Sequence, residues 1–131
     1  MKKFRGYIFS RDFLGERAPQ HVQNIVIRDY CSKKNIQFLL SSVEYAMPNS
    51  SIIFQQLLNE LKVIDGIVAY SMFQLPDSDK IREKTYQKVL KDKKEIHFAV
   101  ENLSIKKSDD IIKIENILKT KKYIKHSLKK I

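Results

Sequence analysis

Residues 6–24 read GYIFSRDFLGERAPQHVQN, an apolar run followed by a polar segment and a proline. The apolar run, extended back to residue 4, is FRGYIF and is typical of a β-strand. Pro19 suits the first turn of a helix, where its fixed φ is already helical and its missing N–H costs no hydrogen bond. The segment therefore predicts a strand, a polar loop and a helix, in that order.

The predicted helix that begins at Pro19 is amphipathic. Its polar side chains, including Gln20, His21 and Asn24, lie away from one apolar stripe. That stripe comprises Val22, Val26, Ile27 and Tyr30. We therefore expect the stripe to be buried against the rest of the domain.

The alternation of strand and helix patterns continues along the chain. Apolar runs of strand length lie at residues 36–42, 65–71 and 95–100, and helical patterns lie at 50–61, 78–91 and from Ser108 onward, with Ser50 or Ser51 as a helix cap. Strands separated by helices pair in parallel through right-handed crossovers. We therefore expect an α/β fold, a single-domain three-layer sandwich with a four-stranded parallel sheet in the order 2-1-3-4.

Composition restricts the class of protein. With 131 residues and 43% hydrophobic content, the chain is long enough for one domain with one core. It has no run of about 18 apolar residues and no secretory signal pattern, so we expect a cytoplasmic protein without membrane insertion. The single cysteine, Cys31, excludes an intramolecular disulfide and a cysteine zinc cluster, and we expect it to be a buried apolar residue.

The formal net charge of +10 is concentrated at the C-terminal end. Residues 106–131 contain nine lysines and three acidic residues, a net charge of +6, whereas residues 1–105 contribute +4. Two interpretations are open: a solvated helix face, or a stripe that contacts nucleic-acid phosphates. We divide the chain into an α/β core, residues 1–105, and a basic C-terminal helix, residues 106–131, that could extend from the domain.

The last helix has an apolar seam of its own, which comprises Ile114, Ile117, Ile124, Leu128 and Ile131. A seam that continues past the domain suggests a partner helix, so we expect a homo-oligomer formed through this helix. The alternative is a frayed tail after about Lys119.

Polar residues follow each predicted strand at its carboxyl end. In open parallel sheets ligands bind at this edge, near the point where the strand order reverses, here between the first and third strands. The residues in question are Ser10, Arg11, Asp12, Arg17, Ser41, Ser42, Glu44, Tyr45, Ser71, Gln74, Glu101 and Asn102. We therefore expect a small-molecule pocket at this edge.

Arg11 and Arg17 are predicted to bind an anionic group, because guanidinium forks match the oxygens of phosphate or carboxylate. The free N–H groups of the helix that begins at Pro19 favour the same kind of ligand. Further binding contacts are predicted for Gln20, Asn24, Tyr45, Ser71, Gln74 and Glu101.

Ser10, His21 and Glu44 are the predicted catalytic residues, with Ser10 as a nucleophile and His21 as an acid or base near neutral pH. Each has a structural alternative: Ser10 caps local backbone, His21 is a surface histidine, and Glu44 pairs with Arg11 or Arg17. No metal or cofactor is predicted, because the three histidines stand apart and neither a dinucleotide fingerprint nor a phosphate loop occurs.

Four segments together resemble one protein family: GYIFS, PQHVQNIVIRDYC, LLNELKVIDGIVAYSMFQLP and EIHFAVENLSI. They are similar to the sporadic carbohydrate cluster proteins, small bacterial proteins encoded among genes for surface polysaccharide biosynthesis. The resemblance covers residues 3–105, and its main motifs are GYIFSRDF, PQHVQN, EYAMP and FAVENL. It implies a role in lipopolysaccharide or other surface glycan biosynthesis, with a sugar phosphate or nucleotide sugar as the ligand.

The order of elements also resembles, more distantly, the catalytic domain of serine recombinases. The GYxRVS-type first strand of that family matches Gly6, Tyr7 and either Ser10 or the next position, and its LLxxLxxGDxxVVxxLDRLxR segment matches residues 57–75. The match departs at the arginines: one corresponds to Phe9, and the later ones fall on MFQLP. The resemblance implies a resolvase-like or flavodoxin-like fold and a helix-mediated dimer, but not strand exchange, which needs cations around the nucleophile.

Three hypotheses follow. The leading one is a cytoplasmic protein of surface glycan biosynthesis, enzyme or binder, with an anion pocket at the strand ends. The second is a nucleic-acid-binding or degenerate resolvase-like protein that uses the basic C-terminal helix, for which binding should weaken steeply with salt. The third is a non-catalytic assembly subunit.

Overall fold

The computed structural model describes residues 1–13 and 17–129, and their side chains as far as residue 121. Every strand and helix predicted from the sequence is present. In chain order the elements are β1 (Lys3–Phe9), α1 (Gln20–Lys33), β2 (Gln37–Glu44), α2 (Ile52–Glu60), β3 (Gly66–Ala69), η1 (Met72–Gln74, a short 3₁₀ helix), α3 (Asp79–Lys91), β4 (Glu95–Phe98), β5 (Leu103–Ile105) and α4 (Ser108–Lys129).

The sheet has the order β2-β1-β3-β4-β5, and its first four strands pair in parallel as predicted. The prediction of four strands was wrong, because β5 pairs antiparallel with β4 and makes the sheet mixed. A tight turn joins the two strands: Asn102 has a φ of 54°, and its N–H donates to the Ala99 carbonyl. Asparagine tolerates this left-handed conformation, which allows the chain to reverse immediately after β4.

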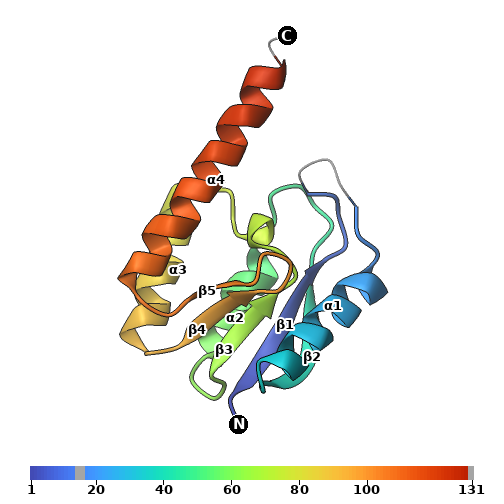
Figure 1. Cartoon of the computed structure of the whole chain (residues 1–131), viewed down its shortest axis with the longest axis vertical. Coiled ribbons are helices and arrows are strands. Elements are labelled where there is room, and N and C mark those ends of the chain that lie inside the picture. Colours follow the sequence, from blue (N-terminus) through green and yellow to red (C-terminus); the bar gives the residue numbers. More distant parts are fainter. Residues whose placement is uncertain (14–16, 130–131) are drawn as a thin grey trace.

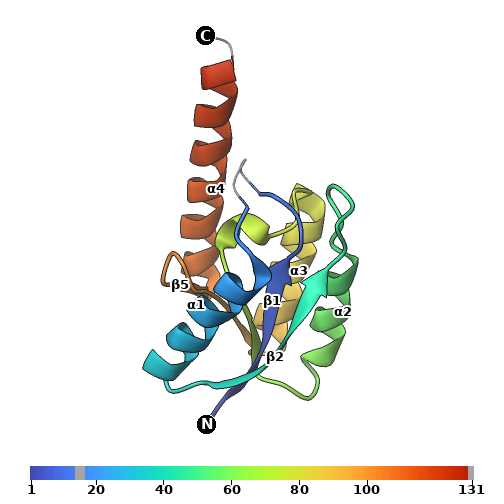
Figure 2. The same cartoon turned by 90° about the vertical axis from the view of Figure 1, so that its right-hand side faces the viewer.

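The helices form layers on both faces of the sheet, with α1 on one side and α2 and α3 on the other (Figures 1 and 2). Beneath α1 lies a core that includes Phe4, Ile8, Ile27 and Cys31. The larger core under α2 and α3 also receives Ile114 from α4. Cys31 is 1% exposed, as expected, and burial raises the pKa of its thiol to about 11.

Gly6 is required where β1 meets an irregularity in β2. Arg5 lies opposite Leu39 but Tyr7 lies opposite Ser42, so β2 contains one extra residue at this point. A Cβ atom on Gly6 would lie 2.1 Å from Ser41 Oγ, closer than any real contact. The glycine therefore makes room for the bulge.

The final helix begins in the domain and then leaves it (Figures 1 and 2). Ile114 is 1% exposed, and Ile117 packs against the same core. Arg82 of α3 fixes this half of the helix, because its Nε donates to Glu115 Oε2 at 3.0 Å. The helix continues to Lys129. The Ile124 and Leu128 side chains and Ile131, the rest of the predicted seam, lie outside the described residues.

Candidate functional site

Two pockets, each of about 420 Å³, lie at the carboxyl edge of the parallel strands, where the sequence predicted a ligand site. Phe13 and Phe73 line both pockets and therefore separate them. Pocket 1 lies between the loops that follow β1, β2 and β3, and pocket 2 lies between the β1 and β3 loops, the β4–β5 turn and α4.

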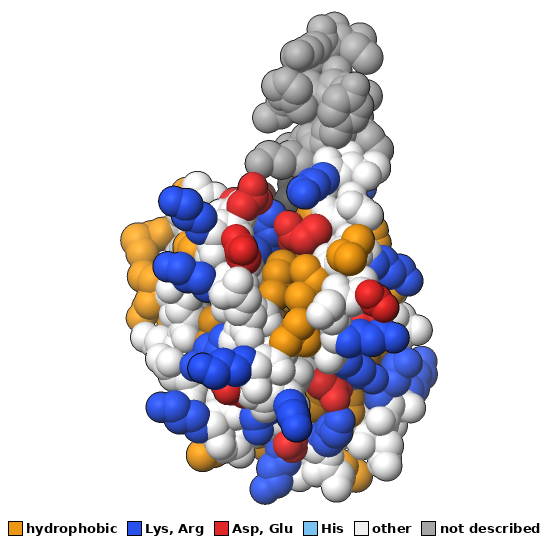
Figure 3. Space-filling view, turned by 90° about the vertical axis from the view of Figure 1, so that its left-hand side faces the viewer, with side chains coloured by type: hydrophobic (Ala, Val, Ile, Leu, Met, Phe, Trp, Pro, Cys, Tyr) orange, Lys and Arg blue, Asp and Glu red, His pale blue; other side chains and the backbone are white. Residues whose placement is uncertain are grey.

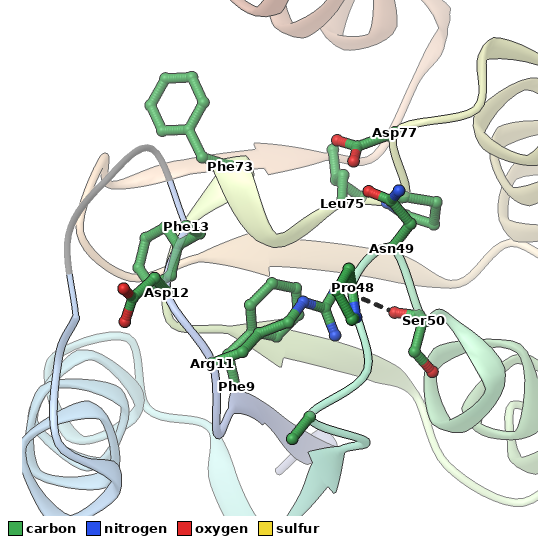
Figure 4. A pocket seen from close by; sticks show the side chains of 12 residues that line it. Phe9, Arg11, Asp12, Phe13, Pro48, Asn49, Ser50, Phe73, Leu75 and Asp77 are labelled. Atoms are coloured by element: carbon green, nitrogen blue, oxygen red, sulfur yellow. Dashed lines mark hydrogen bonds between the residues drawn. The ribbon is translucent and has the colours of Figure 1, made fainter.

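Pocket 1 combines apolar side chains with polar and charged ones (Figure 4). Its lining residues are Phe9, Arg11, Asp12, Phe13, Ala46, Pro48, Asn49, Ser50, Phe73, Leu75, Pro76 and Asp77. Arg82 holds the far wall from behind, since its Nη1 donates to the carbonyls of Pro76 and Asp77 at 2.9 Å each.

Arg11 reaches pocket 1, but its own fold occupies its guanidinium group. Nη1 donates to the Tyr45 carbonyl at 2.9 Å and Nη2 to the Ser50 carbonyl at 3.0 Å. The guanidinium also lies over the Phe9 ring (Figure 4), and its carbon is 4.1 Å from the ring centre. Arg11 therefore clamps the segment between β2 and α2 onto the end of β1 and has fewer donors left for an anion.

Glu44, a predicted catalytic residue, is 1% exposed and makes five hydrogen bonds. Its carboxylate accepts from the Tyr7 and Ser50 hydroxyls and from the N–H groups of Tyr45, Ile53 and Phe54. Two of these N–H groups belong to the first turn of α2, so Glu44 caps this helix in place of Ser51, whose side chain makes no cap. Burial alone would raise the pKa of Glu44, but these donors outweigh it and hold the pKa below the usual value of 4.5.

Ser10 lies at the end of β1, and its hydroxyl donates to the Glu44 carbonyl at 3.1 Å. It does not line either pocket. Its closest polar partner is thus a backbone oxygen, which cannot act as a general base. This arrangement is the structural alternative considered for Ser10, a loop hydroxyl that caps local backbone.

Pocket 2 combines cations, aromatic rings and a carboxylate. Its lining residues are Phe13, Arg17, Ala18, Tyr70, Ser71, Phe73, Val100, Glu101 and Lys121. Arg17 and Lys121 are both exposed, and they come from the loop before α1 and from α4. The Lys121 ammonium lies 5.9 Å from the centre of the Phe73 ring, and the Phe13 and Tyr70 rings meet edge to face at 6.0 Å.

Glu101 of pocket 2 is held from below. Ser71 Oγ donates to Glu101 Oε2 at 2.7 Å, and the Met72 N–H donates to Oε1 at 2.8 Å. The second lone pairs of the two carboxylate oxygens can still accept hydrogen bonds. Among the predicted binding residues, Arg17, Ser71 and Glu101 are therefore brought together in one pocket.

A buried amide that the sequence analysis missed connects the strand ends. Gln23 is fully buried and pairs with both backbone groups of Phe9, donating to its carbonyl at 2.8 Å and accepting from its N–H at 3.0 Å. It also accepts a hydrogen bond from Gln74 Nε2 at 2.9 Å. Gln74 is 1% exposed, so this predicted binding residue supports the pockets from inside and does not line them.

The remaining predicted residues lie outside both pockets. Gln20 and His21 are exposed on the first turn of α1. Asn24 accepts a hydrogen bond from Ser41 Oγ at 2.6 Å and so ties α1 to β2. The Tyr45 side chain is 49% exposed. The structure thus gives no partner arrangement in which Ser10, His21 and Glu44 act together on one ligand.

Within the described parts of the chain, no group of three or more His, Cys, Asp and Glu side chains could hold a metal ion. No helix among the described residues has the length and apolar character needed to cross a membrane.

Two solved structures share this fold over almost their whole length. The N-terminal catalytic domain of the TP901-1 integrase aligns with 95% of this chain and 98% of its own, with a TM-score of 0.58 and 17% identity. A resolvase family site-specific recombinase from Streptococcus pneumoniae aligns with 96% of this chain and 93% of its own, with a TM-score of 0.62 and 8% identity.

No protein-family model matches the chain, and no curated protein matches its sequence. The resemblance to the sporadic carbohydrate cluster proteins therefore has no support. What the comparisons support is the other resemblance: the chain has the α/β fold of resolvase and integrase catalytic domains.

Proposed function

We propose that this chain is a degenerate resolvase-like protein that binds nucleic acid and does not cleave it. The observation that carries the proposal is the basic helix α4, which extends past the carboxyl edge of the sheet (Figure 1). The two structural neighbours, an integrase catalytic domain and a site-specific recombinase, favour nucleic acid over a glycan precursor as the partner.

The charge distribution supports an interface on α4. Figure 3 shows Lys and Arg interspersed with Asp and Glu over the domain on the side of α3 and α4, so this side of the domain has no field of one sign. The excess lies in residues 106–131, which have a net charge of +6. Lys113, Lys119 and Lys121 are all exposed, whereas Glu115 is engaged by Arg82. Exposed lysines on one helix are suited to phosphate contacts.

The side chains near Ser10 support the part of the proposal that excludes cleavage. The recombinase resemblance places one arginine at Phe9, which is 4% exposed, and the later ones on the MFQLP stretch, which contains no arginine. The one arginine beside them, Arg11, is bound to two carbonyls. Phosphodiester cleavage builds negative charge that several free cations must stabilise, and this edge of pocket 1 does not supply them.

The test measures binding of the full chain to a labelled 20-base-pair duplex by fluorescence anisotropy over a series of salt concentrations. We expect the logarithm of the affinity to fall linearly with the logarithm of the salt concentration. The double variant Lys113→Gln, Lys119→Gln should reduce that slope by about two, since each lysine that contacts a phosphate contributes about one.

The matched control is Lys34→Gln, Lys62→Gln, which removes the same charge from exposed lysines at the opposite edge of the sheet. It should leave the slope almost unchanged. Equal losses in the two double variants would reduce the binding to a net-charge effect and overturn the proposal, as would nicking of supercoiled DNA that disappears in Ser10→Ala.

A further inference from the structure

We propose that pocket 2 binds one unpaired nucleotide, with its base against Phe73 and its phosphate against Arg17 and Lys121. This inference rests on the proposed nucleic-acid function and assigns it a site for a single base. A double helix that lies along α4 does not need such a pocket, so the two proposals make separate predictions.

The size and walls of pocket 2 fit a nucleotide. Its volume of about 420 Å³ lies at the lower end of the range for small-molecule sites, which is about 300–1,000 Å³. Phe13, Tyr70 and Phe73 are all partly exposed there, and Val100 is 52% exposed. In Figure 4 the Phe73 ring points away from the residues of pocket 1. Exposed aromatic rings stack with any base, because every base has a π-face.

The charges of pocket 2 distinguish a nucleotide from a simple anion. Arg17 and Lys121 attract a phosphate, but Glu101 in the same pocket repels one. A nucleotide satisfies all three groups, because its base offers N–H donors to the carboxylate while its phosphate meets the cations. The Ser71 and Met72 hydrogen bonds fix the orientation of the Glu101 carboxylate before any ligand arrives.

The position of Lys121 shows how α4 contributes to both proposals. Lys121 follows Ile114 by seven residues, so the two side chains lie on the same face of the helix, two turns apart. Ile114 is buried in the core, whereas Lys121 is exposed over pocket 2, where the helix has passed the sheet. A lysine at this position therefore faces the pocket and not the domain core. A nucleic-acid strand that lies along α4 can place one base in pocket 2 while its neighbouring phosphates still contact the helix α4.

The experiment titrates the full chain with guanosine 5′-monophosphate and, separately, with ribose 5-phosphate, and follows the aromatic proton signals by NMR. The two ligands share the sugar and the phosphate and differ only in the base. We expect the nucleotide to bind about tenfold more tightly, from stacking and the Glu101 contact. Phe73→Leu should remove most of this difference in affinity. Arg17→Gln should lower the affinity for both ligands by a similar factor.

Two control variants change the same residue types outside the pocket. Tyr45→Leu removes an exposed ring, and Arg28→Gln removes an exposed arginine of α1. Neither should change the affinity for the nucleotide. Circular dichroism melting of every variant checks that Phe73→Leu remains folded, and Arg17→Gln, which changes an exposed side chain, tests the pocket independently of that result.

The proposal is overturned if ribose 5-phosphate binds as tightly as the nucleotide, or if Phe73→Leu and Arg17→Gln both leave the nucleotide affinity unchanged. Failure of the general function has a different signature. If duplex binding responds to the α4 lysines but the nucleotide does not bind, only the pocket proposal fails. If the nucleotide binds and the duplex does not, the general nucleic-acid function fails while the nucleotide site stands.

Discussion

The two pockets at the sheet edge have the same volume and share Phe13 and Phe73, yet they hold their cations in opposite ways. In pocket 1 the guanidinium of Arg11 donates to two backbone carbonyls and stacks on Phe9. In pocket 2 Arg17 and Lys121 line the pocket and are exposed. An arginine at a predicted ligand site is therefore informative only once the partners of its donors are known.

The carboxylates beneath the two pockets also differ in how many hydrogen bonds they make within the fold. Pocket 1 is built over the carboxylate of Glu44, whose five hydrogen bonds join β1, β2 and α2. Pocket 2 is built over the Glu101 carboxylate, which has two donors from η1 and its N-cap and faces the pocket. We infer that changes around pocket 1 mainly affect the stability of the fold, whereas changes around pocket 2 mainly affect binding.

The largest expected effect is that of Glu44→Ala. The change leaves the first turn of α2 and the buried Tyr7 hydroxyl without their acceptor, so we expect a loss of about 3–4 kcal/mol in the free energy of unfolding. Urea denaturation followed by circular dichroism measures it. Glu60→Ala, which breaks a partly exposed pair with Arg5, is the control and should cost about 1 kcal/mol or less. Similar losses in the two variants would contradict the role given to Glu44.

The second prediction compares the two arginines directly. Arg11→Ala removes two hydrogen bonds that hold the β2–α2 segment and should cost about 1–2 kcal/mol of stability. Arg17→Ala changes an exposed side chain and should alter stability by less than about 0.5 kcal/mol while weakening nucleotide binding. Urea denaturation of both variants measures the loss of stability, and the nucleotide titration of both measures the loss of affinity. A stable Arg11→Ala variant that loses nucleotide affinity would reverse the assignment of the pockets.

The third prediction concerns pH. The pKa of Glu44 is lower in the folded protein than the ordinary value of 4.5, so the unfolded chain binds more protons just below that pH. The contribution of Glu44 to stability is therefore fully present above about pH 4.5 and is lost as the pH falls toward its folded pKa. Unfolding experiments between pH 3 and pH 6 should show a smaller acid-induced loss for Glu44→Gln than for the wild type. An identical slope in both proteins would show that the carboxylate is not held in its charged form.

The sequence predicted the scaffold well because its signals are local. Apolar runs and Pro19 located β1 and α1, and the alternation of elements led to the parallel order of the first four strands. It missed β5 because a three-residue strand has too short a pattern to recognise. The one local signal was Asn102, whose residue type tolerates the left-handed turn.

The candidate site was harder to predict. Whether a polar side chain there is buried in the fold or faces a pocket depends on hydrogen-bond partners that are distant in the sequence. The donors that bind Glu44 include backbone N–H groups nine and ten residues away, which no side-chain pattern marks. Gln23 offered a usable signal: it precedes Ile27 by four residues and Tyr30 by seven, so it lies on the buried face of α1. A polar amide on an apolar face has to find a buried partner, and here it is the Phe9 backbone.

The smallest predicted effect is that of Lys121→Gln, and it tests whether the two pockets differ in the way described. The ammonium of Lys121 is exposed and strongly hydrated, so its attraction to a bound phosphate is screened, and we expect the nucleotide affinity to fall only about two- to threefold. Thermal melting should stay unchanged, because Lys121 lies beyond the part of α4 that packs on the core.

Lys113→Gln on the same helix is the matched control, since it removes the same charge from a residue that does not line pocket 2. Raising the salt concentration should reduce the difference between Lys121→Gln and the wild type. If the two lysine variants lower the nucleotide affinity equally, α4 acts only through its net charge. In that case the cations of pocket 2 bind a ligand no more directly than Arg11 does in pocket 1.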